Sequence, residues 1–493
     1  MFPNVNLLNI LLLCSGLLIP VPYLIAQRLP KWQMNETLKN VICYWLNFLF
    51  IIILFRVLIG SLLIVTPMEL SGIAKFYPIR IAYPNYGLFQ GLPFVIFCFV
   101  ILAHIEQICN FISGHSFKYF ILYVFSVILL LAVGGIHGGL IDGNIGIANA
   151  TDHLADASLN RTLTDLFVTH TDRIVGLINP SYHAPHSSSH PAGSLAYWQI
   201  ISHHVSPFIF SIINVLLFSL AFPVMYWALH KRFDHVITLQ SVIACLFIPS
   251  MLIYGRSDDA VYYSLAVTVM AFIFVAVHEK KYVFTLLAGI FFIGAMNFSY
   301  ASIVLLPAIF LFNANLTMTK SWQYIRRITP HILILLTIIL IAIIMEMKIT
   351  KFDWLAAFHA SAQHNKDSNI FSLLAHGRYA EVINHRIMAV CDFLIFAGPL
   401  LLYLFISLFK NRRKTPSDWQ IKNVALMLML FVLVINSNGP GEISRPWGSL
   451  FLLIGFFWLP EFFIQKNQIT RFLLIQAQFA WALILQVFLN FSW

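Results

Sequence analysis

Charged residues are scarce in this sequence. Only 10% of its 493 residues are Asp, Glu, Lys or Arg, whereas 59% are hydrophobic. A soluble fold of this size needs more polar surface to cover its apolar core, so the composition excludes one. The sequence therefore predicts an all-α polytopic protein that lies in a lipid bilayer.

Cysteines and metal-site patterns are also scarce. The six cysteines lie inside predicted helices or at their edges, so we expect free thiols and no disulfide framework. No HExxH or similar spacing indicates zinc, so the cofactor stays unknown, with a divalent cation left open. A basic n-region and a cleavage site are missing around residues 5–26, and we expect a retained first helix there and not a signal peptide.

Long apolar runs, by contrast, are abundant. A hydrocarbon core about 30 Å thick needs roughly 20 apolar residues for each helical crossing, and the runs predict about twelve to fourteen transmembrane helices. They lie near residues 5–26, 42–66, 87–108, 119–136, 205–229, 236–254, 259–278, 282–297, 300–314, 329–347, 387–409, 421–436, 447–464 and 472–490. The short pair 282–297 and 300–314 is interpreted as two helices or as one broken helix.

The formal net charge of +10 indicates orientation, and we expect no nucleic-acid partner. If the N-terminus faces outward, every cationic cluster falls on the cytoplasmic side. The clusters are Arg28, Lys31 and Lys39; Lys231 and Arg232; Lys280 and Lys281; Lys320, Arg326 and Arg327; and Lys410, Arg412, Arg413 and Lys414. We predict a multi-pass protein of the plasma (inner) membrane.

This topology divides the chain into parts. They are N-terminal transmembrane helices at 1–136, a large extracytoplasmic loop at 137–204, central transmembrane helices at 205–347, extracytoplasmic interfacial helices at 348–386 and C-terminal transmembrane helices at 387–493. The alternating pattern of 348–386 fits helices lying flat on the membrane, either capping a substrate cavity or forming a structural collar.

The large outer loop supplies the candidate catalytic carboxylates, Asp142 and Asp152. An ionised carboxylate at the membrane interface can act as a general base or hold a divalent cation. The alternative is that a solvated loop simply needs acidic residues. Asp142 is favoured because it lies close to the membrane and is flanked by glycines, which predict a tight non-helical start before a surface helix.

The stretch "HSSSHPAGSLAYW", residues 186–198, follows in the same loop. His186 and His190 are candidate phosphate-binding residues, with helix capping as the alternative. Pro191 and Gly193 favour the start of a helix, whose free N–H groups would point at an anion.

Two further outer turns carry charged candidates. Arg256 and Asp258 precede the predicted helix 259–278. Capping by the serine or by one of the paired aspartates is the favoured interpretation of this turn, and a binding role for Arg256 and Asp258 is the alternative. Glu442 and Arg445 lie three residues apart at a predicted helix start, where they pair with each other or the arginine binds a phosphate.

Taken in order, these motifs resemble bacterial polytopic glycosyltransferases of the GT-C superfamily. The matching residues are an aspartate in the first large outer loop, an HxxxHPPG-like element at His186, His190, Pro191 and Gly193, an FSY segment at 298–300, and GExxRxW at Gly441, Glu442, Arg445 and Trp447. Two departures are Ala192 in place of the second proline and a large loop that follows the fourth predicted helix and not the first.

The resemblance implies a GT-C-like helical core with an outward-facing active site. Its substrates would be a polyprenyl-phosphate sugar donor and an envelope glycan, lipid or protein acceptor. Asp142 would act as the base, His190 would lie near the leaving phosphate and Arg445 would bind it. An O-antigen ligase or polymerase, a flippase of lipid-linked sugars and a purely structural membrane protein are the alternatives.

Overall fold

The structure is a computed structural model. It describes residues 82–84, 87–145, 162–174, 190–202, 204–309, 321–364, 370–410 and 448–491, together with Trp45. Within these residues the chain is helical apart from a single pair of short strands. The all-α prediction is therefore confirmed for the architecture of the described chain, and the strands are a small addition to it.

The first helices are α5 (Leu88–Ala103), α6 (Ile105–Gly114), α7 (Lys118–Gly135), α8 (Asp142–Ile145), α10 (Leu163–Ile174), α11 (Ala192–Ser202), α12 (Pro207–Ser219), α13 (Ala221–Leu229), α14 (His235–Leu246) and α15 (Pro249–Tyr254). The later ones are α16 (Asp259–Glu279), α17 (Tyr282–Phe298), the 3₁₀ helix η2 (Tyr300–Val304), α19 (Ser321–Thr350), α20 (Trp354–His364), α21 (Ile370–Ala375), α22 (Tyr379–Lys410), α24 (Gly448–Ile464) and α25 (Gln468–Phe488).

Several helices begin at polar residues that accept a hydrogen bond from the first turn. Ser206 caps α12 and is followed by Pro207, whose missing N–H costs nothing at that position. Asp234 caps α14 by accepting from Val236 N at 2.8 Å, and Asn467 caps α25 by accepting from Thr470 N at 2.8 Å. These caps satisfy amides that have no partner inside the helix.

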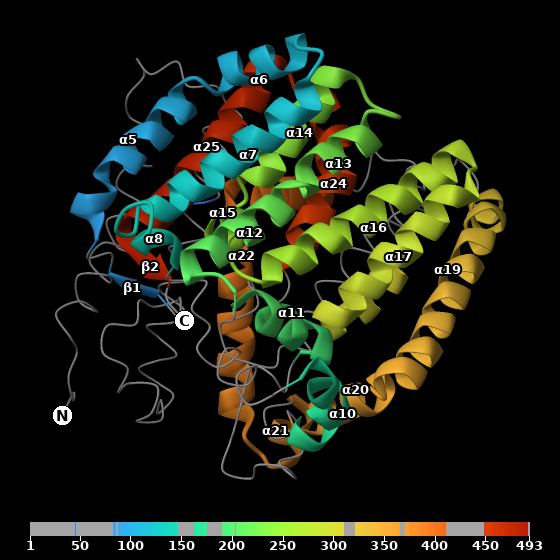
Figure 1. Cartoon of the computed structure of the whole chain (residues 1–493). Coiled ribbons are helices and arrows are strands. Elements are labelled where there is room, and N and C mark those ends of the chain that lie inside the picture. Colours follow the sequence, from blue (N-terminus) through green and yellow to red (C-terminus); the bar gives the residue numbers. More distant parts are fainter. Residues whose placement is uncertain are drawn as a thin grey trace.

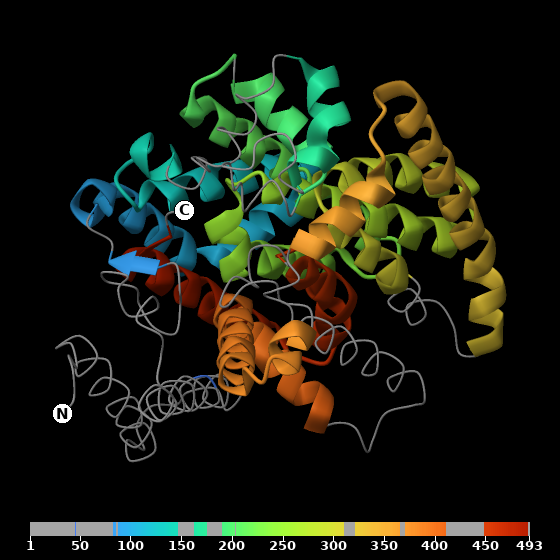
Figure 2. The same cartoon turned by 90° about the horizontal axis from the view of Figure 1, so that it is seen from below.

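The core lies around α14, α15, α16 and α24, whose side chains are buried on nearly all faces. Figure 1 shows α16, α17 and α19 as a row at one edge of the bundle, and Figure 2 shows the same arrangement from below. The outer helix of this row, α19, exposes Leu333 (58%) and Leu340 (59%). Such an apolar surface is what a lipid-facing helix presents.

Five helices in the described part of the chain are long and apolar enough to cross a membrane: Lys118–Gly135, Pro207–Leu229, Asp259–Glu279, Arg326–Thr350 and Gln468–Phe488. They coincide with predicted crossings at 119–136, 205–229, 259–278, 329–347 and 472–490. A sixth, at 87–108, is a pair of helices bent by 70° at His104. The protein therefore has the apolar helices of a multi-pass membrane protein, and the total of twelve to fourteen stays a prediction.

Five other predicted crossings contain shorter apolar helices. The segment 236–254 is not one helix, because Ile248 is extended and Pro249 begins the separate helix α15. The predicted break between 282–297 and 300–314 is confirmed at Ser299, which has extended backbone angles. The crossings predicted at 5–26, 42–66 and 421–436 lie outside the described residues, except for Trp45.

Helices are present in the described residues of both segments that the sequence assigns to the outer face. The surface helix predicted in 137–204 is α10, which begins with Thr162 and Asp165 exchanging hydrogen bonds of 2.7 and 3.1 Å. The short helices α20 and α21 lie in the predicted interfacial segment 348–386. Helix α20 packs against α10, and Trp354 Nε1 donates to Met296 O at 3.1 Å, so this segment covers the end of α17.

A two-stranded sheet ties the C-terminal helix to an earlier segment. Strand β1 (Ala82–Pro84) pairs antiparallel with β2 (Leu489–Phe491), with Tyr83 opposite Asn490. The pairing begins where α25 ends, close to the turn that follows α7, because His137 Nε2 donates to Gln486 O at 3.0 Å. This end of the bundle carries the candidate site.

Candidate functional site

The polar turn between α15 and α16 is buried. Arg256 is 0% exposed, Asp258 4% and Asp259 6%. Charged side chains are rarely buried this completely unless a partner or a ligand requires them. The turn is therefore the strongest candidate site among the described residues.

The Arg256 guanidinium is held by main-chain carbonyls. Its Nη2 donates to Ile253 O at 3.0 Å and its Nη1 to Gly143 O at 3.4 Å, while Nε has no hydrogen-bond partner. Burial lowers the pKa of Arg256 to about 9, so the side chain keeps its charge at neutral pH. No ion pair joins Arg256 to a carboxylate within the described part of the chain.

Gly134 and Asn144 surround the same guanidinium. A Cβ atom built on Gly134 would collide with both Arg256 Nη1 and Asn144 Oδ1, so only glycine leaves room for them. Asn144 Nδ2 donates to Leu131 O at 3.1 Å and to Leu140 O at 2.7 Å, but its Oδ1 has no partner. A buried cation and an unpaired acceptor therefore lie at one point, between α7, α8 and α15.

Asp258 does not cap α16. It is the residue before the helix, but its backbone is already helical and its side chain makes no capping hydrogen bond. Instead, Asp258 Oδ2 accepts from Trp198 Nε1 at 2.8 Å. The favoured interpretation of Asp258 as a cap is wrong, because the indole N–H of α11 satisfies the carboxylate in place of the first-turn amides.

Two residues of α11 and α12 complete this junction. Asn214 Nδ2 donates to Arg256 O at 3.0 Å, and Tyr197 O–H donates to Asn214 Oδ1 at 2.6 Å. Burial, and secondly the charge of Asp258, raises the pKa of the Tyr197 phenol, so it remains a neutral donor. The described part of this stretch, residues 190–198, is thus joined to the turn at Arg256 through Tyr197 and Trp198.

His190 occupies a capping position. Its Nδ1 lies 3.1 Å from Phe298 O, one of the last carbonyls of α17, and its own carbonyl accepts from His170 Nε2 at 3.0 Å. Gly193 lies against the backbone of Asn297, where a Cβ atom would collide. The contacts of His190 therefore match the helix-capping alternative. They also show that the segments around His190 and Phe298–Tyr300 lie side by side.

Pro191 directly precedes α11, as the sequence predicts for a helix start. The helix is short, however, and the crossing predicted at 205–229 begins separately, at Pro207 after its Ser206 cap. Helix α11 therefore ends before that crossing and does not form its beginning.

Asp142 begins α8 and is exposed. The tight turn predicted before it is confirmed, since Gly138 and Gly139 have φ of 139° and 96°, a region that glycine adopts readily. Asp142 makes no hydrogen bond or ion pair with Arg256, but the carbonyl of the next residue, Gly143, accepts the hydrogen bond from Arg256 Nη1. The structure thus brings Asp142 close to the site along the chain.

The other predicted site residues, Asp152, His186, Glu442 and Arg445, lie outside the described residues. Within the described ones, no group of three or more His, Cys, Asp or Glu side chains is placed to hold a metal ion. Three cysteines, Cys98, Cys109 and Cys245, are free, as predicted, and the structure shows that they are buried.

Several residues of the site were not predicted from sequence, among them His137, Asn144, Tyr197, Trp198 and Asn214. Asn214 carried a signal, because a polar residue inside an apolar crossing usually faces the bundle interior. His137 had a weaker sequence signal. Only the structure shows that its pKa is lowered to about 3, first by burial and secondly by the charge of Arg256. No family model, curated protein or solved structure matches the chain.

Proposed function

We propose that this protein is a membrane glycosyltransferase that moves a sugar from a polyprenyl-phosphate donor to an envelope glycan, lipid or protein acceptor. The reaction would take place on the extracytoplasmic face of the inner membrane. The motif resemblance to GT-C enzymes and the apolar helices support this class. The observation that carries the proposal is the buried, charged Arg256 without a carboxylate partner in the described chain.

A buried guanidinium is costly unless an anion compensates its charge. The carbonyls of Ile253 and Gly143 orient Arg256 but supply no negative charge. A donor phosphate would supply it, and arginine binds phosphate with two parallel N–H bonds. Since Arg256 is fully covered by the protein, the phosphate would reach it when α8 moves about the turn at Gly138 and Gly139.

In the proposed reaction, Asp142 takes the proton from the acceptor hydroxyl, whose oxygen attacks the anomeric carbon of the donor sugar. The bond between that carbon and the phosphate oxygen breaks, and polyprenyl phosphate leaves with the electron pair. Arg256 stabilises the charge that develops on this phosphate. Asp258, held by Trp198, fixes the turn that carries Arg256.

The position of the site along α16 supports an outward location. Arg256 precedes the first residue of α16, whereas Lys231, Lys281 and Arg327 lie at its last turn. A helix of 21 residues is about 30 Å long, so these two ends are separated by roughly one hydrocarbon core. The positive-inside rule assigns the cationic end to the cytoplasm and Arg256 to the opposite face.

The test is a transfer assay on the purified full chain in liposomes, with labelled polyprenyl-phosphate sugars and a panel of acceptors. We expect release of polyprenyl phosphate by the wild type and a loss of about 100-fold or more in Arg256→Gln. Arg256→Lys should retain part of the rate because it keeps the charge, and Arg232→Gln at the other end is the control. Full activity of a folded Arg256→Gln protein would remove Arg256 from the mechanism.

A flippase of lipid-linked sugars is the second candidate, because α22 is broken in the middle. Gly398 has φ 78° and ψ 174°, and Pro399 follows it, within the crossing predicted at 387–409. Discontinuous helices form substrate sites in many transporters. The same liposomes decide between the candidates: labelled lipid that crosses the bilayer while no donor is consumed would replace the transferase proposal.

A further inference from the structure

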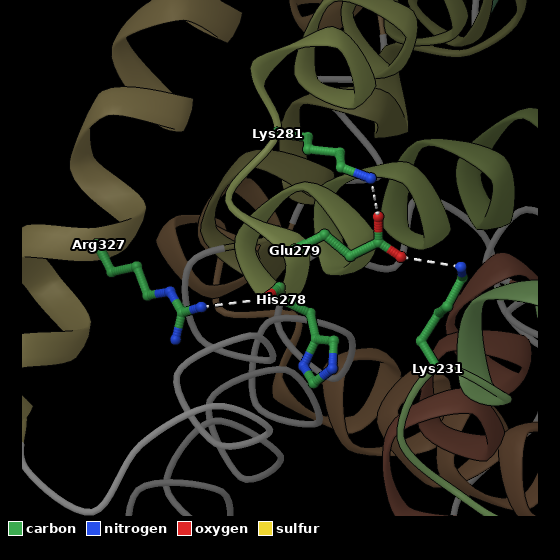
Figure 3. Close-up of polar contacts among 5 residues, drawn as sticks. All are labelled: Lys231, His278, Glu279, Lys281 and Arg327. Atoms are coloured by element: carbon green, nitrogen blue, oxygen red, sulfur yellow. Dashed lines mark hydrogen bonds and ion pairs between the residues drawn. The ribbon is translucent and has the colours of Figure 1, made fainter.

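The end of the bundle opposite Arg256 carries a second polar cluster. It is formed by Lys231 after α13, by His278, Glu279 and Lys281 around the turn between α16 and α17, and by Arg327 of α19 (Figure 3). We name Lys231, Lys281 and Arg327 the cationic cluster. The three residues come from three separate segments, so the fold and not a local charge run brings them together.

One carboxylate is shared by two of these cations. Glu279 Oε1 lies 2.8 Å from Lys231 Nζ, and Glu279 Oε2 lies 2.8 Å from Lys281 Nζ. The lysine side chains are 36% and 59% exposed, whereas that of Glu279 is 20% exposed. The ammonium groups therefore lie towards the surface, over a carboxylate that cancels only one of their two charges.

The carbonyls at the end of α16 account for the position of the Arg327 side chain but not for the positions of the two lysine side chains. Arg327 Nη2 donates to His278 O at 3.0 Å, which satisfies a terminal carbonyl and complements the negative end of the helix dipole. Lys231 and Lys281 bond to the Glu279 side chain instead of to terminal carbonyls. Exposed ion pairs of this kind contribute little to stability, so stability alone gives these lysines no strong role.

The surface beside the cluster is apolar. Tyr282, Val283 and Leu286, which follow Lys281 on α17, are 52%, 53% and 50% exposed. On the neighbouring α19, Leu333 and Leu336 are 58% and 44% exposed. Cations at the end of two helices with exposed apolar side chains along them match the two parts of a lipid, a headgroup above and acyl chains below.

We propose that the cationic cluster binds the phosphate of an anionic phospholipid, whose acyl chains lie along α17 and α19. The two lysines contact the phosphate, Arg327 adds positive charge at the same end of α16, and Glu279 holds the lysines in place between binding events (Figure 3). Tyr282 lies at the boundary between headgroup and chains, where tyrosine is enriched in membrane proteins. This inference is independent of the proposed transferase activity, because it concerns the opposite end of the helices.

The test is a lipid titration of the purified full chain in phosphatidylcholine micelles, followed by the thermal unfolding temperature. We expect phosphatidylglycerol to raise this temperature in a saturable manner, whereas further phosphatidylcholine does not. A juxtamembrane lysine contributes about 1 kcal/mol at an anionic surface, which is about fivefold in affinity. Lys231→Gln with Lys281→Gln should therefore raise the half-saturating phosphatidylglycerol fraction at least tenfold.

Matched variants keep the test decisive. Lys348→Gln with Lys351→Gln removes two exposed lysines at the other end of α19 and should leave the titration unchanged. Glu279→Gln leaves the lysine charges uncompensated and should lower the half-saturating fraction. An unchanged titration in the Lys231 and Lys281 double variant would overturn the proposal. An equal effect of inorganic phosphate would also overturn it, because the site would then recognise phosphate without a lipid.

Discussion

At Arg256 a cation is kept inside apolar surroundings by a small number of neighbouring groups. Two carbonyls accept from the guanidinium, Gly134 leaves it room and Asn214 holds its backbone. His190 lies in a different situation, since its imidazole contacts the carbonyl of Phe298 at a helix end. The proposed phosphate-binding role is therefore placed on Arg256, whose charge has no carboxylate partner among the described residues.

His137 gives the stability of the protein a predictable pH dependence. Its pKa is lowered from 6.5 to about 3, by burial and secondly by the charge of Arg256. Between these values the unfolded chain binds a proton that the folded chain does not, so stability rises with pH. The contribution of His137 is fully present above pH 6.5 and is lost as the pH falls towards 3, at up to about 1.4 kcal/mol per pH unit.

The measurement is the thermal unfolding temperature of the detergent-solubilised protein between pH 7.5 and 4.5. We expect the decrease on acidification to be smaller in His137→Gln than in the wild type. His204→Gln, which changes an exposed histidine, is the control and should follow the wild type. Identical pH profiles for the wild type and His137→Gln would contradict the assignment.

Among the elements, α22 shows how a broken helix is stabilised inside the bundle. Gly398 and Pro399 interrupt the helical hydrogen bonds, and Gln478 of α25 replaces them. Gln478 Nε2 donates to Ala397 O at 2.7 Å, and Leu400 N donates to Gln478 Oε1 at 2.9 Å. One buried amide side chain thus satisfies both an acceptor and a donor of the break.

Gln478→Leu should destabilise the protein strongly, because it leaves both backbone groups buried without a partner. Each such group costs about 1–3 kcal/mol, so we expect a loss of roughly 2–4 kcal/mol in the free energy of unfolding. Gln476→Leu, which removes one bond from Gln476 Nε2 to Leu102 O, is the matched control and should cost less. Chemical unfolding of both variants measures these losses. Equal losses in the free energy of unfolding would mean that Gln478 does not stabilise the break in α22.

In the whole molecule, the buried polar groups and the cationic cluster lie at opposite ends of the helices α16 and α17. Arg256, Asp258 and the cap at His190 lie at one end of α16 and α17, whereas the cationic cluster lies at the other. The segments predicted to be outer and those predicted to be cytoplasmic thus lie at opposite ends of these helices, and which end faces outward stays a prediction.

Cysteine labelling in intact cells tests this orientation. A membrane-impermeant maleimide should label Lys351→Cys directly and Lys281→Cys only after the membrane is permeabilised. The buried native cysteines Cys98, Cys109 and Cys245 should react little in either condition. Labelling in the reverse order would place Arg256 on the cytoplasmic side and contradict an outward-facing site.

The sequence by itself determined the class of protein and the position of most apolar helices. The hydrocarbon core of the bilayer requires apolar residues along the whole length of each crossing. Each crossing can therefore be recognised from the composition and length of its own apolar segment, without knowledge of its tertiary contacts. The start of the crossing near residue 205 and the glycine turn before Asp142 are likewise determined by neighbouring residues. Such features need only neighbouring residues, so they can be predicted from sequence.

Only the tertiary structure decided which polar residues meet. The bonds of Trp198 to Asp258, of Arg256 to Gly143 and of Gln478 to the break in α22 join segments about 60 to 113 residues apart. Sequence shows that each residue must find a partner in an apolar interior, but many partners are chemically equivalent. The packing of the helices selects one of them, and that choice separates the cap at His190 from the buried charge at Arg256.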